Sequence, residues 1–157
     1  MEKLPPIAKV YEAWSAVADG RVKLHPDERR ATVTSSNGEK EYTVSWDEDG
    51  AAYSSNDNAT YWQGYAGYPV IAVLMAQGRL PFDNDMAEGF AHVDWTELNE
   101  RQKRDYAAAV REVVDERGLD AAQADAAAHE VLDALAALDV TVKRGAARPP
   151  RAKSKEA

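Results

Sequence analysis

Hydrophobic residues near the start of the sequence recur every three or four positions. This pattern covers residues 5–19 and consists of Ile7, Val10, Tyr11, Trp14 and Val17. Such spacing places the side chains on one face of a helix, and Gly20 follows as a residue suited to ending it. The pattern predicts an N-terminal helix whose wide apolar face packs against the rest of the protein.

From residue 21 to residue 54 the period changes from about 3.6 to 2. The clearest segment is 41–46, in which Tyr42, Val44 and Trp46 alternate with polar residues. Asn37-Gly38 and Asp49-Gly50 separate the alternating segments and have the composition of tight turns. The pattern predicts an antiparallel β-meander of three or four strands, with a two-residue type I′ turn at Asn37-Gly38.

The stretch 53–82 combines a polar turn, a run of aromatic residues and the longest apolar run of the chain. A helix is expected from residue 59, capped by a short polar side chain in 56–58. Pro69 lacks a backbone N–H and clashes with the preceding turn, so a break or sharp kink is expected at Gly67-Tyr68. The second half, 69–77, is apolar nearly all round, which predicts a buried helix.

The last third of the sequence predicts a C-terminal helical hairpin. Asp94 and Glu97 have capping-box spacing and open a helix expected to run to residue 117, and Asp120 caps the next helix. The second helix carries a seam formed by Ala124, Ala128, Val131, Leu135 and Leu138. The seam is expected either to pack inside the same domain or to be partly shared in a weak homodimer. Together these elements predict the α+β class.

The charge of the chain is unevenly distributed. Residues 1–142 carry 13 basic and 26 acidic side chains, whereas residues 143–157 carry six and one. We expect one globular domain over 1–143 and a disordered basic tail over 144–157. The acidic body disfavours nucleic acid, so nucleic-acid contact is expected only through the basic tail. No signal peptide or membrane span is expected, and a cytoplasmic location fits the absence of cysteine.

A candidate ligand site lies where the polar turn meets the aromatic residues. Side-chain donors and acceptors at the N-terminus of the expected helix come from Asn56, Asp57 and Asn58. Three aromatic residues come next in the sequence: Tyr61, Trp62 and Tyr65. Amphipathic aromatic rings beside convergent polar groups are typical of ligand pockets. The alternative is that the polar residues only cap the helix and the aromatic residues only pack against the sheet.

The sequence contains no phosphate-binding loop, nucleophile elbow or zinc-protease motif, and no histidine has a metal-ligand partner set defined by spacing. No metal or cofactor is therefore expected. We expect a small binding or regulatory module that contacts a protein partner or a small polar ligand. The alternative is a small enzyme with its site at residues 56–58, in which Asp57 acts as base and His92 as its partner.

Overall fold

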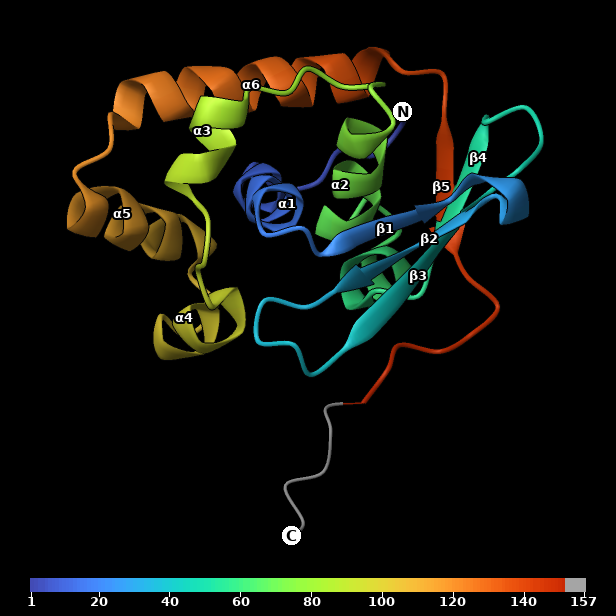
Figure 1. Ribbon diagram of the computed structural model, residues 1–157, viewed down its shortest axis with the longest axis horizontal. Helices are drawn as coiled ribbons and strands as arrows, with labels where there is room; N and C mark the ends of the chain where they lie inside the picture. The colour runs from blue at the N-terminus through green and yellow to red at the C-terminus, as the bar shows by residue number, and fades with distance from the viewer. Residues whose placement is uncertain (152–157) are drawn as a thin grey trace, which may run out of the picture.

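A computed structural model of the chain describes residues 1–151 and has the predicted α+β fold (Figure 1). The strands are β1 (Val22–His25), β2 (Arg30–Thr34), β3 (Glu41–Trp46), β4 (Ala52–Ser55) and β5 (Thr141–Arg144). The α-helices are α1 (Ala8–Ala18), α2 (Tyr68–Ala76), α3 (Asn84–Gly89), α4 (Trp95–Arg101), α5 (Tyr106–Arg117) and α6 (Ala121–Ala137). Two short helical segments complete the order, η1 (Pro26–Glu28) and the π-helix η2 (Ala59–Gln63).

The five strands form one mixed sheet in the order β1-β2-β3-β4-β5. β1 to β4 pair antiparallel, as the alternation of the sequence indicates, whereas β5 pairs parallel to β4 with Tyr53 opposite Val142. β5 was not predicted, because four residues with one apolar side chain give too short a signal. The strand includes Arg144, which the sequence assigned to the tail, and the Gly145 N–H donates to the Ser55 carbonyl at 2.8 Å. The expected disorder of residues 152–157 lies outside the described residues.

The β2–β3 turn differs from the predicted type I′ turn. Gly38 has φ 77°, but Asn37 is not among the residues with positive φ, which a type I′ turn requires at both positions. The Ser35 N–H donates to the Lys40 carbonyl at 2.8 Å, so the loop spans four residues. The Asn37 side chain accepts a hydrogen bond from the Glu39 N–H at 3.0 Å and thereby stabilises this longer loop.

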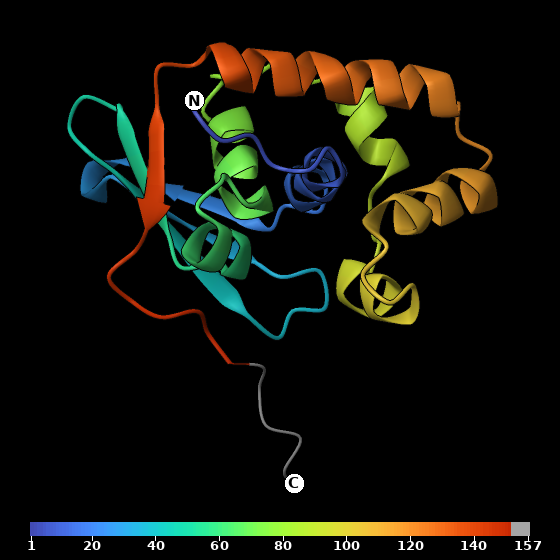
Figure 2. The same ribbon diagram turned by 180° about the vertical axis from the view of Figure 1, so that it is seen from behind.

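The core is built around α1 and α2 (Figures 1 and 2). α2 packs against both α1 and the sheet, and its residues 69–75 are all buried, as its uniform apolarity predicted. α1 contacts α2, α3, α5 and α6, so it is enclosed on several sides instead of on one face. Every residue of α1 from Val10 to Ala16 is buried, including the polar Glu12 and Ser15.

The central stretch is two separate helical segments instead of one kinked helix, and the break begins at Gly64, a few residues before the predicted Gly67-Tyr68. The first helical segment, η2, ends at Gly64 with φ 75°, and α2 begins only at Tyr68. The Gly67 N–H donates to Thr60 Oγ1 at 3.0 Å, which turns the connecting segment back across η2. Pro69 therefore lies in the first turn of α2. Backbone N–H groups in the first turn of a helix have no acceptor within the helix, so the lack of an N–H in proline costs no hydrogen bond there.

The predicted long helix over 94–117 is also wrong, because it is two helices. α4 ends at Arg101, and α5 begins after Asp105, whose carboxylate accepts a hydrogen bond from the Ala108 N–H at 3.0 Å. Between them Lys103 and Arg104 have φ 54° and 65°, a conformation that side-chain-bearing residues rarely adopt. Arg101 supports the turn by donating to both carboxylate oxygens of Glu112 in α5, at 2.7 and 2.8 Å.

Four of the five residues in the α6 seam pack inside the single chain. Ala124, Ala128, Val131 and Leu135 are at most 3 % exposed, whereas Leu138 is only partly buried. α5 and α6 are joined by a three-residue turn and both pack against α1. Within residues 1–151, no helix combines the length and apolar character required to cross a membrane.

Candidate functional site

A polar cleft of about 670 Å³ lies between α1, the β2–β3 loop and α4. The sheet supplies Tyr42 to its lining, the start of α2 supplies Tyr68, and the polar turn before η2 supplies Asp57 and Asn58. Four basic and six acidic side chains line it, so the cleft has mixed charge instead of one dominant sign. The cleft therefore brings together segments that are far apart in the sequence.

One wall of the cleft is an ion pair on α1. Lys9 and Glu12 are three residues apart, which places them on the same helix face, and Lys9 Nζ lies 3.4 Å from Glu12 Oε2. Both side chains are largely buried, with 12 % and 8 % exposure. Burial by itself lowers the pKa of Lys9. The electrostatic attraction of Glu12, Tyr106 and Tyr65 for the ammonium group has the larger effect, so the pKa of Lys9 is raised above its ordinary value. The Lys9 ammonium group also lies 4.4 Å from the centre of the Tyr106 ring.

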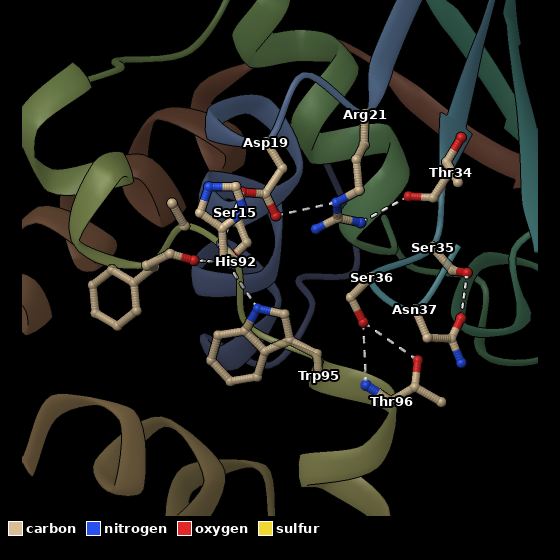
Figure 3. Close-up of polar contacts among 12 residues, drawn as sticks. Ser15, Asp19, Arg21, Thr34, Ser35, Ser36, Asn37, His92, Trp95 and Thr96 are labelled. Carbon is tan, nitrogen blue, oxygen red and sulfur yellow. Dashed lines mark hydrogen bonds and ion pairs between the residues drawn. The ribbon is translucent and has the colours of Figure 1, made fainter. Parts of the chain in front are cut away.

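Arg21 lines the cleft at the point where α1 gives way to β1 (Figure 3). Its Nη1 donates to the Thr34 carbonyl at 2.7 Å, which ties the side chain to β2. Its Nε lies 3.4 Å from Asp19 Oδ2, an ion pair without the geometry of a hydrogen bond. The guanidinium group is thus held from two sides and keeps a fixed position beside the cleft.

α4 forms another wall of the cleft and is attached through one exposed and one buried group of hydrogen bonds (Figure 3). At the surface, the Thr96 N–H donates to Ser36 Oγ of the β2–β3 loop at 3.2 Å. In the core behind the cleft, Trp95 Nε1 donates to Ser15 Oγ at 2.8 Å, and that hydroxyl donates to the Phe90 carbonyl. These bonds join α4 to α1 and to the sheet, so the cleft has walls of defined separation.

Two tyrosine rings line the cleft and meet edge to face with their centroids 6.2 Å apart: Tyr42, which is buried, and Tyr68, which is partly buried. Burial, with smaller contributions from Asp57 and Glu12, raises the pKa of Tyr42 to about 12. Burial raises the pKa of Tyr68 further still, and nearby Arg21 only partly opposes that effect. At neutral pH both hydroxyl groups therefore keep their protons and are available as hydrogen-bond donors.

The raised pKa of Tyr42 predicts a loss of stability in alkali. The folded protein holds the Tyr42 proton up to about pH 12, whereas the unfolded chain releases it near the ordinary value of 10.0. The folded state then binds more protons than the unfolded state between these pH values, so the free energy of unfolding falls as pH rises through them. Urea unfolding at pH 8 and pH 11 should show a smaller fall for Tyr42→Phe than for the wild type. An equal fall in both proteins would contradict the prediction.

Three buried polar atoms beside the cleft make no hydrogen bond within residues 1–151: Glu12 Oε2, Arg21 Nε and Arg21 Nη2. The other Glu12 oxygen accepts a hydrogen bond from Asn99 Nδ2 at 3.2 Å. Unpaired buried polar atoms destabilise a fold, and they are uncommon. Glu12 Oε2 and Arg21 Nε have only the ion-pair contacts with Lys9 and Asp19 described above. One acceptor and two donors without a hydrogen bond in the lining of a single cleft therefore mark it as the candidate functional site.

The polar turn predicted from the sequence contributes to this cleft through Asp57 and Asn58. Asp57 is 3 % exposed and acts as the cap of η2, because its Oδ2 accepts a hydrogen bond from the Thr60 N–H at 3.0 Å. Its Oδ1 accepts a hydrogen bond from Ser55 Oγ. Asn56 instead serves the sheet, since its Oδ1 accepts a hydrogen bond from the Thr43 N–H at 2.8 Å.

The aromatic part of the predicted site lies outside the cleft lining. Tyr61 and Trp62 pack edge to face with centroids 4.7 Å apart, and Trp62 is 64 % exposed. The Arg144 guanidinium group lies 4.5 Å from the centre of the Tyr61 ring. Tyr65 has Lys3 Nζ 5.7 Å from the centre of its ring. The six predicted residues thus divide between the sheet, the cleft and a separate aromatic surface.

The arrangement expected for the enzyme alternative is not what the structure contains. His92 is exposed, and its Nδ1 lies 3.4 Å from Asp19 Oδ1, while both carboxylate oxygens of Asp57 are occupied by Ser55 and Thr60. Asp57 and His92 thus have different partners. Among the described residues, no group of three or more His, Cys, Asp or Glu side chains is placed to hold a metal ion.

Sequence reasoning missed Lys9, Glu12 and Arg21. On a helix with one buried face, charged residues away from the apolar stripe are expected in solvent. A usable signal was present in the composition of α1, AKVYEAWSAVA, which contains few polar residues for a helix with a solvated side. So little polarity predicts enclosure on several sides and hence burial of some of those polar groups.

Comparison with protein-family models gave a match over residues 2–141, a range that contains every residue lining the cleft. Lys143 and Arg144 lie beyond the matched range. Comparisons with curated proteins and with solved structures gave no match. The chain belongs to the family described as "Uncharacterised conserved protein UCP014422".

Proposed function

We propose that the protein is a binding module whose cleft takes a small polar ligand. The proposal rests on the buried Glu12 and Arg21 atoms that make no hydrogen bond within residues 1–151 and that belong to the lining of a cleft of about 670 Å³. Ligand pockets of this size combine a shaped cavity with a few convergent polar groups. A fold without a use for these groups would gain stability by replacing them with apolar side chains.

The arrangement of the lining favours a ligand with both hydrogen-bond donors and acceptors. Glu12 presents an acceptor, whereas Lys9 and Arg21 present donors, and the neutral hydroxyls of Tyr42 and Tyr68 add two more. The Tyr42 and Tyr68 rings offer apolar area beside these polar groups. Free amino acids, hydroxy acids and sugars have this combination of groups, whereas a purely apolar ligand would leave the charges desolvated and unpaired.

The proposal is tested by screening small polar compounds against the ¹⁵N-labelled protein. The panel contains the common amino acids, monosaccharides, short carboxylic acids and inorganic phosphate. A ligand of the cleft should shift the backbone amide signals of the β2–β3 loop and of α4, which form its two sides. Signals that move only on other surfaces, or no movement with any compound, would contradict the proposal.

A matched variant separates binding from stability. Lys9→Met with Glu12→Gln removes both charges while keeping side chains of similar length. The affinity of a compound found in the screen should fall at least about tenfold, the usual effect of losing one charge-assisted hydrogen bond. The melting temperature should stay equal or rise, because a buried ion pair contributes little net stability. Lys23→Met, on the exposed side of β1, is the control and should change neither quantity.

A further inference from the structure

A second surface, separate from the cleft, is formed where η2 meets β5. The parallel pairing of β5 with β4 brings Arg144 opposite Ser55, close to the start of η2. Figure 2 shows β5 at the edge of the sheet, with the chain running on from its end. The Asn56 Nδ2 donates to the Arg148 carbonyl at 3.5 Å, so the segment after β5 also stays beside this turn.

Two aromatic rings and an arginine are in contact on this surface. The Arg144 guanidinium group lies 4.5 Å from the Tyr61 ring centre and 5.9 Å from the Trp62 ring centre. Trp62 is 64 % exposed, and only Leu4 accompanies it as an exposed large hydrophobic residue within residues 1–151. Most of the Trp62 side chain is therefore accessible to a planar ring of a binding partner, with a cation beside it.

The surface has a charge opposite to that of the rest of the protein. Between residues 51 and 82 the only acidic residue is Asp57, which is buried, and between residues 140 and 155 there is none. The second segment contributes Lys143, Arg144, Arg148 and Arg151, all of them exposed. The two segments that form the surface therefore offer basic side chains without exposed carboxylates.

We propose that this surface binds single-stranded nucleic acid, with a base stacked on Trp62 and phosphate groups contacting Arg144 and its basic neighbours. Sequence-tolerant binding of single strands uses this combination of an open aromatic face and a basic track along the backbone. A peptide of acidic residues would satisfy the cations but offers no aromatic ring to stack on Trp62. A duplex has its bases already stacked, so it would use the cations alone.

The test measures the fluorescence anisotropy of a labelled oligouridine titrated with the full chain. Binding should be seen at about 50 mM salt and should weaken roughly 50-fold at about 200 mM, as expected for four phosphate contacts on a single strand. Trp62→Ala should weaken binding at least about fivefold, the lower end of the effect of losing one stacked base. Trp62→Phe should recover part of the loss, and Arg144→Gln should reduce the salt dependence.

Lys23→Gln is the matched control, because it removes one exposed positive charge from β1 and should leave binding unchanged. The melting temperatures of Trp62→Ala and wild type should agree, since the side chain is mostly in solvent. Absence of binding at low salt, or equal binding by wild type and Trp62→Ala, would overturn the proposal. Equal competition by an oligoglutamate, a duplex RNA or phosphatidylglycerol vesicles would overturn it in favour of an acidic peptide, a duplex or a membrane.

Discussion

Replacement of Trp14 by alanine is expected to lower the free energy of unfolding by about 3–5 kcal/mol. Trp14 is 1 % exposed and contacts both Tyr11 and Phe90, with ring centroids 5.0 and 5.6 Å apart. Tyr11 and Phe90 also meet each other edge to face. Removal of one ring from this group leaves a cavity at the contact of α1 with α3, where the close packing of several elements limits collapse.

The effect of Trp14→Ala is measured by urea unfolding followed by circular dichroism. Trp62→Ala is the control, since it removes the same side chain from a position that is 64 % exposed, and it should change the free energy of unfolding by less than about 0.5 kcal/mol. A fall of less than about 1 kcal/mol for Trp14→Ala would show that the three aromatic rings do not form the centre of the core.

Gly67→Ala is expected to destabilise the fold by about 2–5 kcal/mol, through overpacking and the loss of buried hydrogen bonds. The backbone of Gly67 has φ −70° and ψ 171°, which any residue can adopt, so no backbone strain is involved. The added Cβ would instead overlap the buried carboxylate of Asp57. The Asp57 carboxylate would have to move and would lose its hydrogen bonds from the Thr60 N–H and Ser55 Oγ. Both donors are buried, so they would be left without an acceptor.

A double-mutant cycle isolates this contact. Asp57→Ala loses the cap of η2, but Gly67→Ala added to Asp57→Ala should cost much less than Gly67→Ala alone, because the overlap is gone. Gly64→Ala is the control: its Cβ would meet nothing within 4 Å, and only the positive φ of 75° would be unfavourable, by about 1–2 kcal/mol. Additive effects of the two substitutions would disprove the contact between Gly67 and Asp57.

Periodicity and capping residues predicted most of the elements but not where they are interrupted. Asp94 and Asp120 cap their helices as their sequence positions indicate, with hydrogen bonds from Glu97 N–H and Gln123 N–H. The break after Arg101 is obscured in the sequence, because Gln102, Lys103 and Arg104 are good helix formers. The local signal was Asp105, which caps α5. The contact of Arg101 with Glu112, eleven residues away, accompanies the break and is not described by local propensity.

The cleft was harder to predict than the fold. Asp57 and Asn58 were found because a cluster of short polar residues is visible along the sequence. Lys9, Glu12 and Arg21 come together with them only through the packing of α1 against the sheet and α4. In the sequence, a charged residue in a helix that lies in solvent looks the same as one in a buried site. The two cases can be told apart only when it is known that α1 is enclosed on several sides.

The parallel pairing of β5 has a consequence for the order of folding. β1 to β4 are joined by short connections and can assemble while the chain is still being synthesised, whereas β4 and β5 pair residues as far apart as Ala52 and Thr141. Contacts of such high sequence separation are slow to form, because a long loop must close first. We therefore expect β5 to dock late, so that Arg144 reaches the Tyr61 ring only after the helices between β4 and β5 have been synthesised.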